Sequence, residues 1–347
     1  MRVGIATVQV PFVWDPVTAR ADELAQALRR GGHEAEIISV PFKDYPPERI
    51  PEQMLACRLL DLEESMGTRI DRLIGLAFPA YLIPHSAKVI WLLRRPRDAY
   101  DLWDSPYGSL HGKPGGEEVR QVIRSAEARL IAQARAVFVP SYSAADQLGR
   151  ECGLEALPLM APPPSHELYG YQEDGNFFLF PSLDGGPLRS SLVIEAVRRA
   201  RHPLRVNILG PSPDRVARGA EIGCAYLGDA DGCVRWLNVT KEQRQAVFGT
   251  CLAVVFPPLG ENDGTVALEA MLSQKPLITC TDSGAVAELV EDGQTGFVRP
   301  PSPEALAEAM DRLWEDRGLT HRQGCAAYQR YRELKLSWEV VVDRLLA

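Results

Sequence analysis

The sequence lacks three features that would each assign it to a broad class of proteins. No apolar run approaches the roughly 20 residues that a membrane-spanning helix requires. The seven cysteines contain no C-x-x-C pair, and an odd count without metal-ligand spacing indicates reduced, structural thiols. Basic residues are not in excess, since 46 acids face 38 bases and the formal net charge is −8. This balance argues against a broad nucleic-acid-binding surface, which needs clustered Lys and Arg.

The chain also lacks a recognisable targeting segment. Its first residues already have the composition of a buried strand, so we predict no signal peptide and expect a cytoplasmic protein. No internal repeat or low-complexity tract is present. Hydrophobic residues make up 46% of the 347 positions, which is enough to fill the cores of two domains.

Strand-like and helix-like segments alternate along the whole chain, which is typical of parallel sheets joined by crossover helices. Predicted strands lie at 2–8, 36–40, 72–76, 88–93, 136–139, 177–180, 205–209, 225–227, 252–256 and 276–280. Predicted helices lie at 19–30, 117–134, 141–151, 265–272 and 337–346. The run Ala161–Pro164 cannot form regular structure and marks a linker. The prediction is an α/β protein with two Rossmann-like halves.

Residues 257–271, between the predicted strand at 252–256 and the predicted helix at 265–272, are the most informative segment. A loop between strand and helix lies at the carboxyl edge of an α/β sheet, where ligands bind. The backbone N–H groups of Gly264, Thr265 and Val266 are predicted at a helix N-terminus, where they can bind an anion such as a diphosphate. Glu269, one turn later, can reach the paired hydroxyls of a ribose or a sugar. Spacing alone leaves open an ordinary surface loop with two solvated acids.

Three motifs in the second half carry a family resemblance. They are the E-x7-E pair Glu261 and Glu269, the run Ser283–Val298 and the helix-like run Pro303–Met310, "PEALAEAM". In this order and spacing they resemble the retaining, nucleotide-sugar-dependent glycosyltransferases of the GT-B fold, family 4 (group 1 type). The resemblance covers most of the chain and is strongest over 238–310. Weaker similarity at 42–47, 101–103 and 138–148 suggests a divergent bacterial member.

The resemblance implies a GT-B fold, with two Rossmann-like domains facing a central cleft. Residues 1–163 would form the acceptor-side domain and 164–330 the nucleotide-sugar domain, with 331–347 as a last helix that returns to the N-terminal domain. Such an enzyme would move a hexosyl group from a nucleotide-diphosphate donor to an acceptor hydroxyl with retention. It would use no metal and no cofactor besides this co-substrate. The acceptor (glycan, lipid or small molecule) and the oligomeric state, homo- or hetero-oligomer, remain open.

The resemblance also assigns site residues. Glu261 would be the catalytic residue that holds donor-sugar hydroxyls, and Glu269 would accept both ribose hydroxyls. Asn238 would lie near the nucleotide base, although a helix cap before residue 240 is an equal alternative. The loop and helix start that would bind the rest of the donor comprise Asn262, Asp263, Gly264, Thr265 and Val266.

Several residues depart from the family pattern. Family members usually carry an Arg and a Lys after the first strand of the second domain, where this chain has Ser182 and Leu188. Arg189 is the only nearby cation and the candidate substitute for binding the donor phosphates. The loop after the first strand of the chain lacks the usual Gly-Gly and instead contains Trp14 and Asp15, which disfavour a nearby phosphate.

A basic cluster in the first half leaves two alternatives open. Arg94, Arg95 and Arg97 follow a predicted strand, so they are either a compensating anion clamp or a solvated loop.

Three functions compete at this point. The intact E-x7-E pair favours an active retaining glycosyltransferase. The missing Arg and Lys favour a catalytically degenerate GT-B protein that binds a nucleotide sugar or serves as a non-catalytic partner subunit. The third alternative is another GT-B enzyme such as a sugar-nucleotide epimerase.

Overall fold

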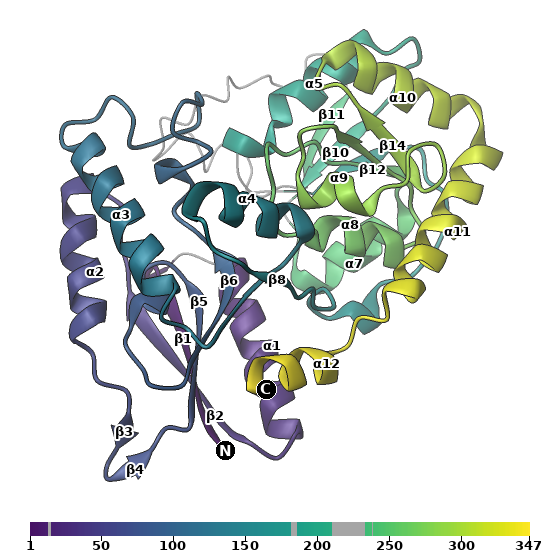
Figure 1. Cartoon of the computed structure of the whole chain (residues 1–347). Helices are drawn as coiled ribbons and strands as arrows, with labels where there is room; N and C mark the ends of the chain where they lie inside the picture. The colour runs from purple at the N-terminus through teal and green to yellow at the C-terminus, as the bar shows by residue number, and fades with distance from the viewer. Residues whose placement is uncertain (13–14, 182–185, 210–232, 238) are drawn as a thin grey trace. The chain divides into compact units, whose positions relative to one another are not determined.

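The computed structural model describes residues 1–12, 15–181, 186–209, 233–237 and 239–347 (Figure 1). The chain divides into two compact units. The first unit comprises Met1–Pro164 and Leu336–Ala347, and the second comprises Ser165–Lys335. Each unit is built on a parallel sheet of six described strands. The predicted α/β class with two Rossmann-like sheets is therefore confirmed.

The sheet of the first unit has the strand order β2-β1-β5-β6-β7-β8. Its central strands are almost fully buried, as expected for strands of a parallel sheet that is covered by helices. A two-stranded hairpin, which the sequence did not predict, lies outside this sheet. The strand bounds are β1 Arg2–Gln9, β2 Glu34–Pro41, β5 Arg72–Ala77, β6 Lys88–Arg94, β7 Ala136–Val139 and β8 Leu157–Pro158, with the hairpin at β3 Glu64–Ser65 and β4 Thr68–Arg69.

The helices of the first unit begin where the sequence supplies caps. Asp15 caps α1 through a hydrogen bond from the backbone N–H of Val17, and Ser141 caps α4. The sequence did not predict α2. Leu55 and Leu59 are apolar but exposed, so the apolar residues of this helix do not follow one buried face. The bounds are α1 Pro16–Arg30, α2 Ile50–Leu59, α3 Gly116–Ile131 and α4 Tyr142–Cys152.

The last helix, α12 (Trp338–Leu346), packs on the first unit, as predicted. Trp338 meets Trp91 edge to face with 6.2 Å between ring centroids. Val341 and Leu345 are fully buried in the same core, and Arg72 Nη2 donates to the carbonyl of Leu346 at 2.8 Å. The first unit is therefore completed by the C-terminal end of the chain.

The sheet of the second unit has the strand order β11-β10-β9-β12-β13-β14. The order reverses between β9 and β12, which places a topological switch point at the carboxyl ends of these two strands. The predicted strand at 225–227 lies outside the described residues, and the sequence did not predict β11 or β14. The bounds are β9 Phe178–Phe180, β10 Val206–Leu209, β11 Val234–Leu237, β12 Ala253–Val255, β13 Leu277–Cys280 and β14 Gly296–Arg299.

The helices of the second unit include one that matches its prediction residue for residue, α8 at Thr265–Leu272. It follows β12 directly, so the E-x7-E segment lies on a strand–loop–helix unit. The other helices are α5 Ser190–Arg199, α7 Lys241–Thr250, α9 Ala285–Leu289, α10 Pro303–Glu315 and α11 Arg317–Leu334.

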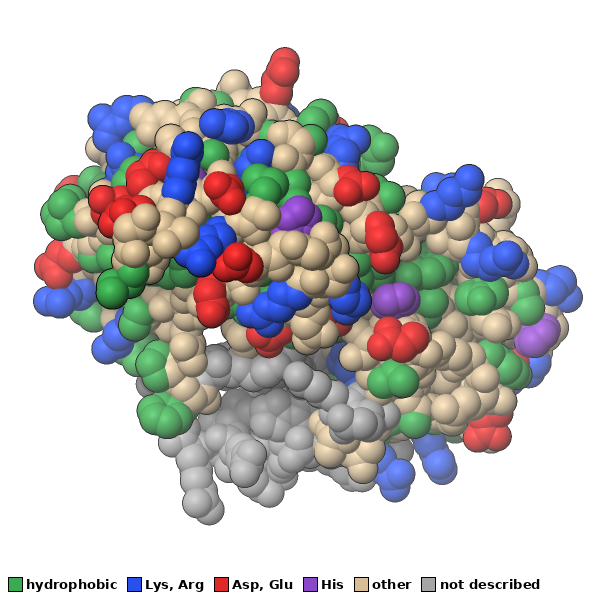
Figure 2. All heavy atoms as spheres, turned by 90° about the horizontal axis from the view of Figure 1, so that it is seen from below, with side chains coloured by type: hydrophobic (Ala, Val, Ile, Leu, Met, Phe, Trp, Pro, Cys, Tyr) green, Lys and Arg blue, Asp and Glu red, His purple; other side chains and the backbone are tan. Residues whose placement is uncertain are grey.

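Charged side chains of both signs are intermixed on one face of the molecule. Figure 2 shows one face, where blue Lys and Arg side chains alternate with red Asp and Glu side chains. Among the described residues, no helix is both long enough and apolar enough to cross a lipid bilayer.

Candidate functional site

The candidate site of the second unit lies at the carboxyl ends of β9 and β12. Ligands of open α/β sheets bind at such a switch point. Three segments reach this edge: the end of β9 at Pro181, the loop from β12 to α8, and the first turn of α7. Their side chains determine what the edge can bind.

Glu269 is buried at this edge in an ion pair with Arg244. Arg244 Nε lies 3.1 Å from Oε1, and Nη2 lies 2.6 Å from Oε2. The Tyr169 hydroxyl donates to Oε1 at 2.5 Å. The Glu269 side chain is 5% exposed and the Arg244 side chain 21%. Burial lowers the pKa of Arg244, but the adjacent Glu269 carboxylate outweighs this effect and raises it overall.

The position of Arg244 follows from how α7 begins. The Thr240 hydroxyl accepts from the backbone N–H of Gln243 at 3.3 Å, and Gln243 Oε1 accepts from the backbone N–H of Thr240 at 2.9 Å. This capping box fixes the first turn, which carries Arg244. The alternative that Asn238 caps this helix is wrong, because Thr240 is the cap. Asn238 itself lies outside the described residues, so its place near a base stays a prediction.

Glu261 shapes the loop that precedes α8. Its Oε1 accepts from the backbone N–H groups of Asn262 at 3.0 Å and Asp263 at 3.2 Å. Its carbonyl accepts from the backbone N–H of Ala285 at 2.7 Å. Gly284 makes this approach possible, since an added Cβ would lie 2.4 Å from the Glu261 carbonyl oxygen. The start of the run Ser283–Val298 therefore supports the loop that contains Glu261.

The start of α8 differs from its prediction in one respect. We expected the N–H groups of Gly264, Thr265 and Val266 to be available to an anion. Asp263 Oδ1 instead accepts from the backbone N–H of Thr265 at 2.9 Å and from its hydroxyl at 2.6 Å. Gly264 packs against α9, where an added Cβ would lie 2.5 Å from Leu289 Cδ1. An anion at this helix start has to displace the Asp263 carboxylate from Thr265.

Arg189 is bound by the protein itself. Its guanidinium donates to the carbonyls of Pro257 at 2.7 Å and Pro258 at 2.6 Å, and to both carboxylate oxygens of Asp282 at 3.0 and 2.7 Å. These bonds use four of its five N–H groups. Arg189 therefore ties the loop after β12 to the end of β13, and its role toward a phosphate stays a prediction. The sequence could not show this pairing, because Asp282 is 93 positions away.

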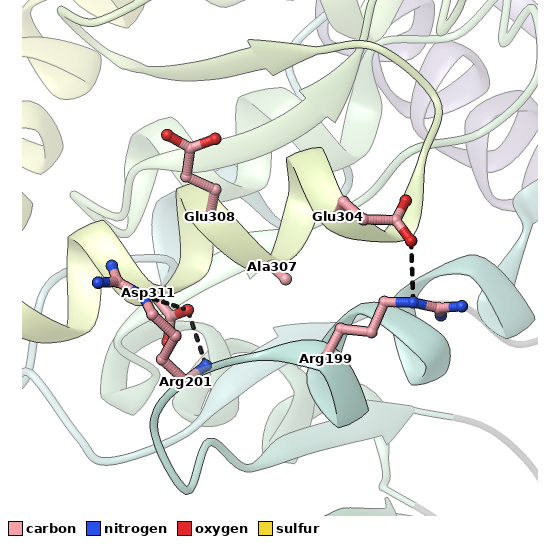
Figure 3. Close-up of a pocket in the computed structure, with 6 residues that line it drawn as sticks. All are labelled: Arg199, Arg201, Glu304, Ala307, Glu308 and Asp311. Carbon is pink, nitrogen blue, oxygen red and sulfur yellow. Dashed lines mark hydrogen bonds and ion pairs between the residues drawn. The ribbon is translucent and has the colours of Figure 1, made fainter.

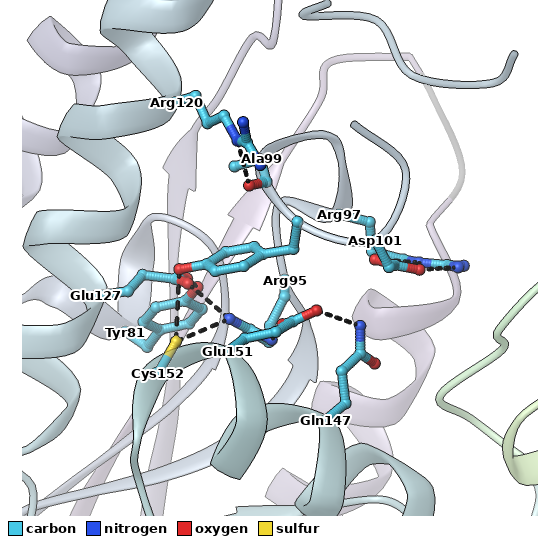
Figure 4. Close-up of polar contacts among 11 residues, drawn as sticks. Tyr81, Arg95, Arg97, Ala99, Asp101, Arg120, Glu127, Gln147, Glu151 and Cys152 are labelled. Atoms are coloured by element: carbon cyan, nitrogen blue, oxygen red, sulfur yellow. Dashed lines mark hydrogen bonds and ion pairs between the residues drawn. The ribbon is translucent and has the colours of Figure 1, made fainter. Parts of the chain in front are cut away.

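The arginines at and just after the end of β6 in the first unit are paired with acids, and Figure 4 shows the pairs of Arg95 and Arg97. Arg95 Nη1 lies 2.6 Å from Glu151 and Nη2 lies 3.1 Å from Glu127. Arg97 is paired with Asp101, and Arg94 with Asp15. Neither alternative, an anion clamp or a solvated loop, describes Arg95, whose side chain is 6% exposed.

Glu127 is the centre of this buried network in the first unit. It accepts from the hydroxyl of Tyr81 and from Arg95, whose guanidinium stacks on Tyr100 at 4.0 Å from the ring centroid. Burial raises the pKa of Tyr81, and the adjacent Glu127 carboxylate raises it further. The network holds the end of β6 against α3 and α4. Sequence patterns could not predict this network, because its members come from elements that are distant along the chain.

An open hollow of about 400 Å³ lies between α5 and α10 in the second unit (Figure 3). Four of its charged side chains form two ion pairs, Arg199 with Glu304 and Arg201 with Asp311. Arg201 lies shortly before β10 in the chain, so the hollow is at the amino edge of the sheet. Ligands of such sheets bind at the opposite edge.

Comparison with known proteins identifies the family. The model described as "Glycosyl transferases group 1" matches residues 189–316. The chain is 28% identical over 162 residues to O-antigen chain mannosyltransferase C of Escherichia coli, covering 46% of this chain and 42% of that protein. It is 25% identical over 347 residues to the D-inositol 3-phosphate glycosyltransferase of Corynebacterium diphtheriae, covering 89% of this chain and 78% of that protein.

The chain belongs to the group 1 glycosyltransferases. These relatives are distant, and the first curated relatives are matched over less than half of their own length. The fold of this group 1 glycosyltransferase is GT-B. The Anabaena protein HepE, solved in complex with UDP-glucose, superimposes with a TM-score of 0.67 at 14% identity, covering 99% of this chain and 98% of that one.

Proposed function

We propose that this group 1 glycosyltransferase moves a hexosyl group from a nucleoside-diphosphate donor to an acceptor hydroxyl with retention of configuration. One observation carries the proposal: the E-x7-E pair lies on the β12–α8 unit, beside the end of β9 at the switch point of the sheet. The family of the chain supports the reaction class. HepE, whose structure contains UDP-glucose, and the relatives named as a mannosyltransferase and a D-inositol 3-phosphate glycosyltransferase support a nucleotide hexose as the donor.

Each part of the site has a separate task in this proposal. Glu261 holds hydroxyls of the donor sugar and is the catalytic residue. The segment 262–266 contacts the diphosphate through backbone N–H groups once the ligand replaces the Asp263 carboxylate at Thr265. Glu269 binds the ribose, and Asn238 lies by the base. The protein then contributes by orienting the donor and by stabilising the charge that develops on the leaving diphosphate.

Arg189 acts in this proposal by fixing the loop. Its bonds to Pro257, Pro258 and Asp282 hold the carbonyl ends of β12 and β13 at a constant separation. This holds the backbone of Glu261 in place, because Gly260 donates to the carbonyl of Asp282 at 2.8 Å.

A second candidate function rests on Arg189. Because Arg189 has four of its donors occupied by the protein, a diphosphate receives little from it. This favours a protein that binds a nucleotide sugar, or a partner subunit, without turnover.

A transfer assay on two Glu261 variants tests the proposal. The Glu261→Ala variant removes the carboxylate and also the acceptor for the N–H groups of Asn262 and Asp263. The Glu261→Gln variant keeps an acceptor oxygen for the loop but removes the charge. We expect both variants to lose transfer to a panel of acceptors, by about 100-fold or more. The Glu308→Ala variant, with its change on an exposed face of α10, is the matched control and should keep full activity.

The outcome separates the two functions. Full activity in Glu261→Gln would overturn the assignment of Glu261. A wild-type protein that binds nucleotide sugars but forms no product with any acceptor would favour the binding function instead.

A further inference from the structure

Most of the acceptor capacity of Glu269 is already used by the protein. Oε1 accepts from the Tyr169 hydroxyl and from Arg244 Nε, and Oε2 accepts from Arg244 Nη2. A carboxylate offers about four acceptor positions, so about one remains, on Oε2. With these bonds in place, Glu269 has about one position left for a ribose hydroxyl, whereas the family resemblance implies that it accepts both.

Arg244 presents donors beside this remaining position. Nη2 lies 2.6 Å from Oε2 and carries a second N–H. Nη1 lies 3.5 Å from the carbonyl oxygen of Pro181, at the long limit of a hydrogen bond. The Arg244 side chain is also the more exposed member of the pair. The guanidinium is therefore the member of the pair that lies next to the carboxyl end of β9 and is the more accessible of the two.

A donor and an acceptor side by side match a vicinal diol. Each hydroxyl of a diol both donates and accepts, so one can donate to Oε2 while its neighbour accepts from an Nη of Arg244. The ion pair is neutral as a whole, and a phosphate at the same place would face the Glu269 carboxylate. Charge and geometry together favour a neutral diol over an anion at this point.

We propose that Arg244 is a ribose-binding residue. In the assigned arrangement, one ribose hydroxyl donates to Glu269 Oε2 and the other accepts from the Arg244 guanidinium. Tyr169 is a positioning residue, because its hydroxyl holds the carboxylate through Oε1 and contacts no ribose hydroxyl in this arrangement. This inference rests on the proposed function and adds to it the groups that select a ribonucleotide over a deoxyribonucleotide.

The test pairs protein variants with ligands that lack single hydroxyls. Wild-type protein is titrated by calorimetry with UDP, GDP and ADP, and the tightest of these is compared with its 2′-deoxy and 3′-deoxy forms. The same three ligands are titrated into Arg244→Lys, which keeps the charge beside Glu269 but loses the second Nη group, and into Glu269→Gln.

We expect the wild-type protein to bind each deoxy form about tenfold more weakly, the cost of one hydrogen bond to a charged group. In Arg244→Lys, one of the two deoxy forms should bind as tightly as the ribose form, while the other deoxy form should still bind more weakly. In Glu269→Gln, removal of the other ribose hydroxyl should no longer weaken nucleotide binding. Arg322→Lys, with its change at an exposed position of α11, is the matched control and should behave as wild type.

A merely structural role of Arg244 gives a different result. Equal weakening of the ribose form and both deoxy forms in Arg244→Lys would overturn the proposal, and this is the result that we expect for the positioning variant Tyr169→Phe. The wild-type titrations test the idea even if a variant does not fold. Tight nucleotide binding with no loss for either deoxy form would overturn the ribose assignment alone, whereas no binding of any nucleoside diphosphate would overturn the proposed function as well.

Discussion

Single polar side chains in this glycosyltransferase are held by partners far away in the sequence. Glu269 is paired with Arg244, 25 positions earlier, and with Tyr169, 100 positions earlier. The family resemblance predicted that Glu269 lies at the ligand edge, but it could not predict these partners, because no local pattern links them. The same holds for Arg189 and Asp282. The place of Glu269 on a helix that follows a buried strand could thus be predicted from the sequence, whereas the bonding of its side chain required the structure.

His85 gives a prediction at the scale of one residue. Its Nδ1 accepts from the backbone N–H of Ala87 at 3.0 Å, and its Nε2 lies 3.1 Å from the carbonyl of Ile70. Burial lowers its pKa from 6.5. Its charged neighbours act in opposite directions: Glu63 raises the pKa, and Arg69 and Arg135 lower it. The folded-state pKa is thus below the unfolded value. The neutral ring therefore stabilises the fold fully above about pH 6.5, and this contribution is lost as the pH falls through the folded-state pKa.

Urea unfolding between pH 5 and pH 8 tests this prediction. The free energy of unfolding of the wild-type protein should fall below pH 6.5 more steeply than that of His85→Asn, whose amide oxygen can replace the Nδ1 acceptor without titrating. Parallel curves for the two proteins would show that His85 does not contribute to the pH dependence.

The elements follow the sequence closely where an apolar segment or a helix cap marks their bounds. The bounds of α8 agree with the prediction at both ends, and α4 begins after its predicted cap Ser141. The strands β11 and β14 were missed because each is four residues long and lies at an edge of its sheet. Short edge strands carry little alternation to detect. The elements that position the candidate site were therefore the easier ones to predict.

A pair of glycine substitutions tests how the elements hold the loop of Glu261. Gly284 lies at the start of α9 with φ +60°, and a Cβ there would lie 2.4 Å from the Glu261 carbonyl oxygen. Gly293 has φ +77° with open space around it. Gly284→Ala should lower the free energy of unfolding by about 2–5 kcal/mol through backbone strain and overpacking. It should also lose sugar transfer, because the Glu261 backbone has to move.

Gly293→Ala carries the conformational strain alone, about 1–2 kcal/mol, and should keep its activity. Equal losses of stability and activity in both variants would show that the contact between Gly284 and Glu261 is not what positions the loop. Denaturant unfolding and the transfer assay give the two measurements.

The molecule as a whole consists of two α/β units, and the chain returns to the first of them at its C-terminal end. Trp338, Val341 and Leu345 of α12 complete the core of the first unit. The amphipathic pattern of 337–346 predicted a helix, and the resemblance to GT-B enzymes predicted where it packs. Periodicity alone could not have done so, because the contact joins residues such as Trp91 and Trp338 that are far apart in the sequence.

The central claim is that the switch-point edge of the second unit binds an activated sugar, and thermal unfolding with ligand tests it most directly. A ligand that binds the folded state at 100 times its Kd adds about 2.7 kcal/mol of stability. We predict that at least one nucleoside-diphosphate hexose, such as UDP-glucose or GDP-mannose, raises the Tm of the wild-type protein and raises that of Glu261→Gln less. An unchanged Tm of the wild-type protein with every member of a panel of such donors at millimolar concentration would contradict binding of an activated sugar at this edge.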